Sequence, residues 1–310
     1  MISIYKSTSS GLEPQTEIIS GCWINVVDPT TDEIESLSKL GIPQDFITYP
    51  LDVDERSRTE REDDGTVLIV LRVPYFQGVR ADIPYITIPL GIIINDEYIV
   101  TICRWKNDVI QKFLNGQVRS FSTLKHNQFV LRILLHTASK YLIDLREINR
   151  TVDILEDQLQ LSMNNNQLLE ILKYQKSMVY FTTALKSNEL MVERLQRSQL
   201  FRMYAEDEDL LEDVITENQQ AIEMTNIFNN ILSSMMDAFA SIISNNMNMV
   251  MKFLASVTIV LSLPTIVTSF FGMNVPLPFE NAGMGYLVIL AATVLISLIV
   301  VAIFYRRDWF

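Results

Sequence analysis

Two uncharged apolar runs near the end of the chain constrain its fold more than any other feature. No Asp, Glu, Lys or Arg occurs from Phe253 to Phe279, or from Asn281 to Tyr305. A helix needs about 20 apolar residues to cross the hydrocarbon core of a bilayer, and Phe253–Phe271 and Gly285–Tyr305 both meet this length. A buried hairpin of a soluble protein is the alternative, but two such runs favour a membrane protein with two spans.

Basic residues next to these runs predict the orientation. Lys252 precedes the first run, Arg306 and Arg307 follow the second, and the loop between them carries only Glu280. Because positive residues stay on the cytoplasmic side, we expect both termini in the cytoplasm and the short loop outside the cell membrane. The start of the chain lacks the apolar segment of a signal peptide, which agrees with this orientation.

Composition excludes several classes of function. The formal net charge of −12 argues against a nucleic-acid partner and suits contact with cations. Two cysteines far apart suggest neither a disulfide framework nor a metal knuckle, and fit a reducing compartment. The sequence shows no nucleophile–base pair and no Gly-rich phosphate loop, so we do not expect an enzyme.

The first third of the chain predicts a small α/β domain, residues 1–120. Its β-branched runs are bounded by turn residues, as strands require, with a hairpin turn at Asn95-Asp96-Glu97. Thr30 and Glu33 have the spacing of a helical capping box, and Gly41 with Pro43 supplies the stop signal. The expected strands are 66–76, 85–95 and 98–103, and the expected helix lies within 28–43.

The remainder predicts long helices, because no Pro occurs between Pro89 and Pro264 and no Gly between Gly116 and Gly272. Residues 121–208 are expected to form an antiparallel pair, with helices over about 122–161 and 167–204. A stalk helix over 209–252 continues into the first span. At 1.5 Å per residue the stalk and span together measure about 95 Å, which suits a rigid link to a cytoplasmic domain.

A stripe of small and polar residues follows one side of the first span. It has two interpretations: close packing between helices, which small residues permit, or a water-filled lumen shared by several copies of the chain. One span cannot enclose a pore, so the second interpretation requires an oligomer. The stripe consists of Asn248, Met251, Ala255, Thr258, Ser262, Thr265 and Ser269.

The short loop that follows favours the lumen. It spans 272–284 and opens with Gly272-Met273-Asn274, and the chain ends in "YRRDWF" over 305–310, of which 306–310 form a basic tail. Here the chain resembles the CorA family of magnesium channels, which carry a Gly-Met-Asn signature and a similar tail. The resemblance covers the whole architecture. It implies a membrane α+β protein with an N-terminal cytoplasmic α/β domain, a long helical stalk and two C-terminal spans, 253–271 and 285–305, assembled as a homopentamer.

The resemblance also implies roles for individual residues. Gly272, Met273 and Asn274 would form the selectivity filter, with Gly272 giving the backbone freedom that ends the helix. Mg²⁺ gives up its water reluctantly, so amide and carbonyl oxygens that accept hydrogen bonds from a hydrated ion suit conduction better than carboxylates. Met251 and Leu254 would form a hydrophobic gate above a polar ring at Asn248.

Regulation is expected in the cytoplasmic part. In the family, carboxylates of the α/β domain and of the next subunit's stalk bind regulatory Mg²⁺; Asp52, Asp54 and Asp213 are the matching candidates. The alternative for the charged segment 51–63 is a solvated loop. Glu280 is the one acidic residue of the outer loop.

The resulting hypothesis is passive Mg²⁺ influx across the cytoplasmic membrane, gated by intracellular Mg²⁺. The expected partners are further copies of the chain, membrane lipid and divalent metal ions. One alternative is the same fold moving Zn²⁺, Co²⁺ or Ni²⁺, although Met273 in the signature favours Mg²⁺ over the family's zinc branch. A membrane-anchored helical scaffold without transport is the alternative from another class.

Overall fold

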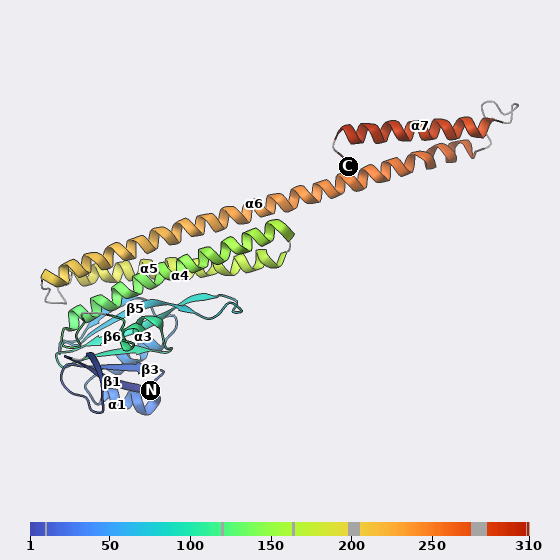
Figure 1. Ribbon diagram of the computed structural model, residues 1–310. Coiled ribbons are helices and arrows are strands. Elements are labelled where there is room, and N and C mark those ends of the chain that lie inside the picture. Colours follow the sequence, from blue (N-terminus) through green and yellow to red (C-terminus); the bar gives the residue numbers. More distant parts are fainter. Residues whose placement is uncertain are drawn as a thin grey trace. The chain divides into compact units, whose positions relative to one another are not determined.

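The chain contains two compact units, Met1–Ser233 and Ser234–Phe310. The division falls inside helix α6 (Ala205–Phe271), so this helix belongs to both units. The first unit holds the β-sheet, and the second holds the apolar end of α6 and helix α7 (Gly285–Arg306) (Figure 1). The computed structural model describes residues 1–9, 11–118, 121–162, 165–197, 205–273, 284–307 and 309.

The described strands form one seven-stranded sheet in the order β2-β1-β3-β7-β6-β5-β4. Strands β3 and β7 run parallel, and the other neighbouring pairs are antiparallel. The strands are β1 (Ile2–Thr8), β2 (Gly11–Gln15), β3 (Cys22–Val27), β4 (Arg58–Arg61), β5 (Val67–Phe76), β6 (Tyr85–Ile94) and β7 (Tyr98–Cys103).

The central strands confirm the expectations from sequence. β5, β6 and β7 match the three predicted runs within one residue at each end. The predicted hairpin turn between β6 and β7 is present, because the Asn95 side-chain oxygen accepts hydrogen bonds from the backbone N–H of Glu97 at 2.9 Å and of Tyr98 at 2.8 Å. The capping box is also present, with Thr30 and Glu33 each bonding the other's backbone.

Four strands were not predicted. β2 is mostly polar and partly exposed, and its sequence lacks apolar alternation. β1 is only partly buried, and its apolar alternation is limited to the short run from Ile2 to Ile4. β4 lies inside the charged segment 51–63, and the interpretation of that segment as a solvated loop is therefore wrong for Arg58–Arg61. Backbone pairing with β5 makes this segment a strand although its side chains are charged.

Helices cover both faces of the sheet. Helices α1 (Thr31–Ser38) and α2 (Gln44–Thr48) and the 3₁₀ helix η1 (Tyr49–Leu51) pack on one face through Leu37, Phe46 and Ile47. Helices α3, α4 and α5 cover the other face, as Figure 1 shows. Their bounds are Asp108–Leu114, His126–Ser162 and Asn165–Arg197.

Alternation along the strands supplies both faces with apolar side chains. Ile24 on β3 joins the cluster under α1 and α2, while its neighbour Trp23 joins the cluster under α3 and α4. Trp23 is fully buried and lies edge-on to Phe129, with ring centroids 5.1 Å apart. Its indole N–H donates to Thr101 Oγ1 at 2.8 Å, which satisfies the one polar atom of this side chain.

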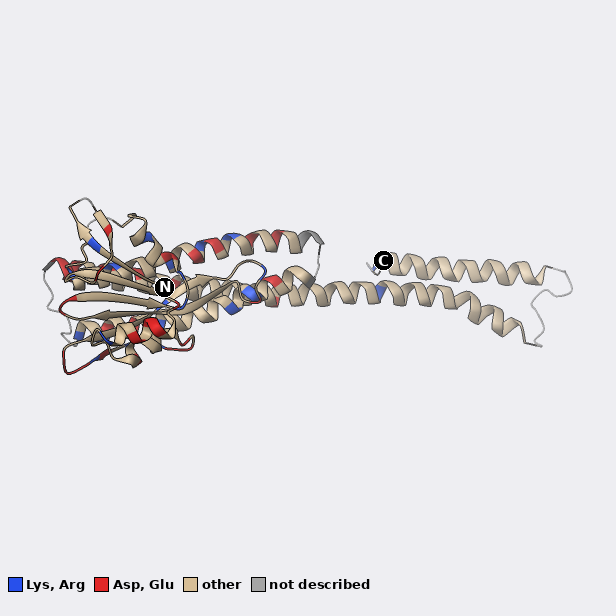
Figure 2. Ribbon diagram, turned by 90° about the horizontal axis from the view of Figure 1, so that it is seen from below, with Lys and Arg blue, Asp and Glu red and all other residues tan. Residues whose placement is uncertain are grey.

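The long helices occur where the absence of Gly and Pro predicts them. Helices α4 and α5 pack against each other (Figures 1 and 2). Helix α6 begins at Ala205, four residues before the predicted start, and runs through Pro264 to Phe271. Its first turn carries Glu206, Asp207 and Glu208, which complement the partial positive charge of a helix N-terminus.

Candidate functional site

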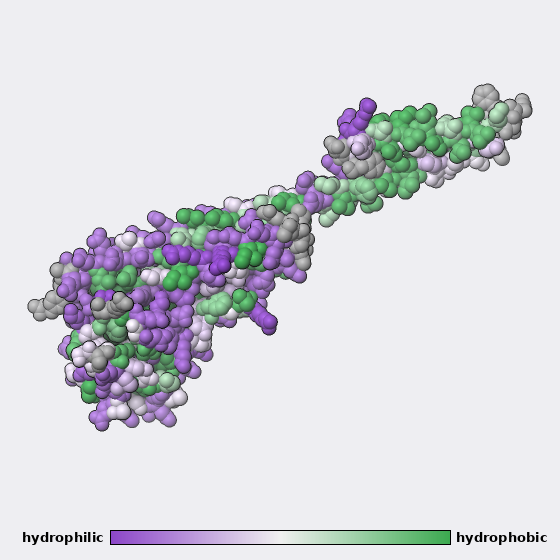
Figure 3. All heavy atoms as spheres, in the orientation of Figure 1, coloured by the Kyte–Doolittle hydropathy of each residue, from purple (hydrophilic) through white to green (hydrophobic). Residues whose placement is uncertain are grey.

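The end of α6 and the whole of α7 are suited to a membrane. Within the described residues, these are the two helices long and apolar enough to cross a bilayer. In Figure 2 both segments are almost free of charged residues, and in Figure 3 apolar side chains cover them. Large apolar side chains are exposed along both helices, and a bilayer would shield them from water. Among them are Phe253, Leu261, Phe270, Leu290 and Leu298.

Helix α7 lies beside the C-terminal part of α6 in both ribbon views (Figures 1 and 2). Ser256 on α6 is 0% exposed and Thr293 on α7 is 6% exposed, although most residues around them are exposed. Val260 and Val267, one and three turns beyond Ser256, are half-buried on the same side of α6. Ser256, Val260 and Val267 thus mark the side of α6 that packs against α7.

The polar stripe lies on the other side of α6. At 3.6 residues per turn, Thr258 is about 200° around the helix axis from Ser256, and Thr258, Thr265 and Ser269 are exposed. Asn248, Met251, Leu254 and Ala255 are exposed as well, and Ser262 is half-buried. The stripe is therefore not used for packing against α7 within one chain.

Hydroxyl groups on the stripe present oxygen lone pairs outward. Thr258 Oγ1 donates to the Leu254 carbonyl at 2.8 Å, and Ser262 Oγ donates to the Ile259 carbonyl at 2.9 Å. Thr265 Oγ1 makes a similar bond to Leu261 at 3.3 Å. Each hydroxyl hydrogen is thus occupied by the helix itself, so the oxygen is left as an acceptor. Acceptors of this kind suit a cation that arrives with its water molecules.

Close packing, and not a left-handed backbone, explains Gly272 at the end of α6. Its N–H donates to the Thr268 carbonyl at 2.8 Å, and a Cβ at this position would lie 3.0 Å from the same oxygen. The φ angle of Gly272 is not positive. The expectation that conformational freedom at Gly272 ends the helix is therefore wrong. Met273 is exposed. Asn274 and Glu280, expected in the filter and the outer loop, lie outside the described residues.

The cytoplasmic candidates are exposed carboxylates. Asp52 follows η1, and its side-chain oxygen accepts a hydrogen bond from the Asp54 backbone N–H at 3.0 Å. Asp52, Asp54 and Asp213 are all exposed. Within the part of the chain that the structure describes, no group of three or more His, Cys, Asp or Glu is placed to hold a metal ion. A single copy therefore supplies no complete metal cage from these residues.

Arg72 on β5 anchors the segment that carries Asp52 and Asp54. Its guanidinium Nη1 donates to the backbone carbonyls of Val53 at 2.9 Å and Glu55 at 2.7 Å. Burial lowers the pKa of Arg72, and the negative charges of Asp54 and Asp52 are among the influences that oppose this shift. The two carboxylates thus occupy a fixed loop.

Two further contacts hold this loop in place. Asn188 on α5 bonds both the N–H and the C=O of the Arg72 backbone, at 3.0 and 2.9 Å. Pro50 of η1 lies so close to Gly91 on β6 that a Cβ on Gly91 would collide with its ring. Arg72 was not predicted as a functional residue, although a lone charge inside the apolar run of β5 indicates a buried polar contact.

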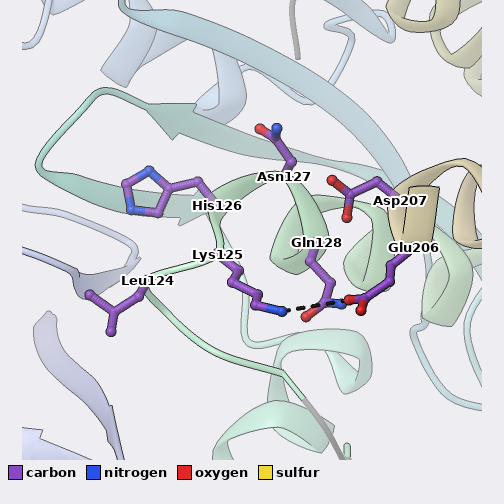
Figure 4. Close-up of a pocket in the computed structure, with 7 residues that line it drawn as sticks. All are labelled: Leu124, Lys125, His126, Asn127, Gln128, Glu206 and Asp207. Carbon is purple, nitrogen blue, oxygen red and sulfur yellow. Dashed lines mark ion pairs between the residues drawn. The ribbon is translucent and has the colours of Figure 1, made fainter. Parts of the chain in front are cut away.

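A separate cavity of about 620 Å³ lies between the starts of α4 and α6 (Figure 4). Lys125 Nζ lies 3.6 Å from Glu206 Oε2 across it. His126 points away from Glu206 and Asp207 (Figure 4), and burial lowers the pKa of its imidazole. Imidazole and carboxylates therefore do not converge on one point, and this cavity is not a metal centre.

Comparison with known proteins identifies the family. The model of the CorA-like Mg2+ transporter protein family matches residues 20–306. The chain belongs to the CorA-like Mg2+ transporter family. Membership makes it a divalent-cation transporter of the membrane and not an enzyme, and it leaves a non-transporting scaffold without support.

Relatives of this CorA-like chain agree over its full length. The cobalt/magnesium transport protein CorA of Methanocaldococcus jannaschii is 30% identical over 327 aligned residues, covering 100% of both proteins. The complete structure of that CorA magnesium transporter superposes with a TM-score of 0.86 at 29% identity, covering 100% of this chain and 99% of the other. The full-length CmaX protein shares the fold alone, with a TM-score of 0.72 at 13% identity over 100% of this chain and 97% of that one.

Thiol labelling tests the assignment of the two sides of α6. Thr258→Cys and Thr265→Cys should react with a charged, membrane-impermeant thiol reagent in the membrane-embedded protein, because both positions lie on the polar stripe. Background labelling should be low, because Cys22 and Cys103 are buried and burial raises the pKa of both thiols, that of Cys103 to about 11.

Ser256→Cys is the matched control, because it moves the thiol to the side of α6 that packs against α7. It should stay unlabelled. Equal labelling of Ser256→Cys and Thr258→Cys, or no labelling of either threonine position, would contradict a water-filled path along the stripe.

Proposed function

We propose that the chain assembles as a homopentamer in the cytoplasmic membrane and conducts Mg²⁺ passively into the cell through a pore lined by α6. The observation that carries the proposal is the exposed polar stripe on the side of α6 away from α7, ending at Gly272-Met273-Asn274. One stripe needs further copies to close a lumen, and the number five follows from the family resemblance. Lipid would cover the apolar sides of α6 and α7.

The direction of flow follows from charge. A divalent ion that moves down a membrane potential of 100 mV gains about 4.6 kcal/mol, at about 2.3 kcal/mol per charge. With both termini in the cytoplasm, the acidic first unit faces the arriving ions and the filter faces outward. The basic residues Lys252, Arg306 and Arg307 beside the spans support this orientation.

Cobalt is the second candidate ion, because the Methanocaldococcus jannaschii relative is named a cobalt/magnesium transport protein. A filter that binds a hydrated ion through amide and carbonyl oxygens selects by charge and hydrated size, and this would admit Co²⁺ or Ni²⁺ beside Mg²⁺. Zn²⁺ prefers nitrogen and sulfur ligands, which neither the stripe nor Gly272-Met273-Asn274 supplies in the form of His or Cys.

The filter is tested by Asn274→Ala. Purified protein in liposomes with an entrapped Mg²⁺ dye should lose most of its uptake, because the change removes the amide oxygen that holds the hydrated ion. Asn281→Ala makes the same chemical change in the same loop outside the Gly-Met-Asn motif and should keep its uptake. Wild-type flux through a correctly assembled Asn274→Ala oligomer would contradict the assignment of Asn274 to the filter.

Met251 and Leu254 would form the gate, as a hydrophobic constriction that closes by excluding water. Leu254→Ser should wet the constriction and raise flux at high internal Mg²⁺ several-fold. Ile259→Ser is the control, since Ile259 is exposed and lies about 140° around the helix axis from Leu254. If Leu254→Ser and Met251→Ser both conduct like the wild type at low and high Mg²⁺, the gate lies elsewhere.

Asp52, Asp54 and Asp213 would form a regulatory Mg²⁺ site that keeps the channel closed, called the brake below. Carboxylates on neighbouring copies repel one another, and a bound Mg²⁺ held between them would favour the closed arrangement over the open one. Because no described group within one chain is a metal cage, the site would be completed by a second copy. The fixed loop around Arg72 supports this role, since it holds Asp52 and Asp54 in place before the ion binds.

The brake is tested by Asp213→Ala. Flux should remain high at millimolar internal Mg²⁺, where the wild type closes, and Mg²⁺ should protect the variant less against proteolysis. Glu212→Ala removes a carboxylate from the neighbouring exposed position, about 100° around the helix, and should close normally. Closure of Asp213→Ala at the wild-type Mg²⁺ concentration, with equal protection, would leave Asp213 as a solvated helix residue.

A further inference from the structure

A cavity of about 800 Å³ lies in the first unit between α5 and the segment anchored by Arg72. This volume falls within the range of small-molecule pockets. Neither the transport path along α6 nor the carboxylate of Asp213 contributes to its lining. The cavity therefore needs an explanation of its own.

The charge of the lining is opposite to that of the protein. Four basic residues, Arg56, Arg72, Lys186 and Arg194, line the cavity with one acidic residue, Asp54, in a chain whose net charge is −12. Among the ion pairs of the described residues, none involves any of these four basic side chains. Their positive charge is directed at the cavity without a carboxylate partner in contact.

Arg72 gives this charge a fixed position. Its guanidinium is held by neutral oxygens, those of Val53, Glu55 and Thr87. Arg56, Lys186 and Arg194 are exposed and line the same cavity. Guanidinium and ammonium groups around one hollow are the groups that proteins use to bind phosphate oxygens.

A hydroxyl group adds a hydrogen-bond donor. Ser187 Oγ accepts a hydrogen bond from the Ser57 backbone N–H at 3.2 Å. No acceptor for its own hydrogen occurs among the described hydrogen bonds, so this hydrogen is available to a ligand. Asn188 Oδ1 accepts a hydrogen bond from Ser57 Oγ at 2.6 Å, which fixes the Ser57 hydroxyl.

Apolar and aromatic side chains of α5 line the cavity beside the basic ones. Val179, Tyr180 and Leu190 belong to this lining and are all exposed. Tyr180 offers a ring face on which a planar base can stack. An inorganic phosphate would contact only the basic and hydroxyl groups, whereas a nucleotide would also contact these apolar and aromatic side chains.

Asp54 is the one lining group that would repel a bare anion. Mg²⁺ removes this conflict, because the ion is commonly bound by one or two carboxylates together with the phosphates of a substrate. We propose that the cavity binds a polyphosphate anion together with Mg²⁺, and that this anion is a nucleoside triphosphate. The proposal stands on the cavity alone and does not depend on the transport path.

Binding to the full-length protein in detergent tests the proposal. Calorimetric titration with Mg²⁺–ATP should show saturable binding, and titration with Mg²⁺–tripolyphosphate should show weaker binding because Tyr180 then contacts nothing. Equal affinities would assign the site to inorganic polyphosphate while supporting a polyphosphate site. Absence of saturable binding by either ligand overturns the proposal.

Variants of exposed residues locate the site without disturbing the core. Lys186→Gln combined with Arg194→Gln should weaken Mg²⁺–ATP binding about tenfold or more, through loss of charge-assisted hydrogen bonds. Lys176→Gln, also on the exposed surface of α5 but outside the cavity, is the matched control and should bind as the wild type. Equal losses in both, or no loss in the double variant, would place the binding elsewhere and overturn the assignment.

Asp54→Asn tests the role of the metal. In the wild type, removing Mg²⁺ with a chelator should weaken ATP binding, whereas in Asp54→Asn the affinity should change little on Mg²⁺ removal. A wild-type Mg²⁺ dependence in the variant would contradict a metal ion held between Asp54 and the phosphates. Because Asp54 is also assigned to the brake, Asp213→Ala is the control: it removes a carboxylate of the brake that does not line the cavity, and it should leave the Mg²⁺ dependence of ATP binding unchanged.

Discussion

Backbone hydrogen bonding within α6 is the constraint on which the rest of the structure depends. A chain that enters hydrocarbon must satisfy its N–H and C=O groups internally, and a continuous helix does so residue by residue. Helix α6 keeps this pattern from Ala205, in the unit with the sheet, to Phe271, except at Pro264, which has no N–H to donate. The polar side chains of the span obey the same rule, since Ser256, Thr258 and Thr265 donate to carbonyls of their own helix.

The two sides of α6 differ in their surroundings, because α7 covers only one of them. Helix α7 covers the side with Ser256, Val260 and Val267. The other side carries a row of hydroxyl and amide groups that no helix or strand of the described residues covers. An isolated span of this kind would expose polar groups to lipid, so the sequence is consistent only with a neighbour or with water along that row.

The first unit supports a charged surface on a largely apolar core. Trp23 and the aromatic rings around it hold the sheet to α3 and α4, and the clusters on both faces exclude water from β5, β6 and β7. Arg72 is a half-buried charge beside this core. Its guanidinium donates to backbone carbonyls of the acidic loop, and it thereby fixes both the loop carboxylates and the basic cavity, whose lining includes Asp54.

Local sequence patterns predicted the spans, the long helices, the three central strands and the family. These features rest on local rules: apolar length, absence of Gly and Pro, β-branched runs between turn residues, and a three-residue motif at the end of a striped helix. The same rules placed the capping box at Thr30 and the turn at Asn95. Each of these depends on residues that are neighbours in the chain.

Only the tertiary structure decided the remainder, because it depends on residues far apart in the chain. Strand β4 exists through pairing with β5 and not through its own charged sequence. Arg72 binds carbonyls that lie 17 and 19 residues away, and Asn188 reaches it across 116. No local pattern encodes such contacts, since they form only when the sheet and α5 close around the same loop.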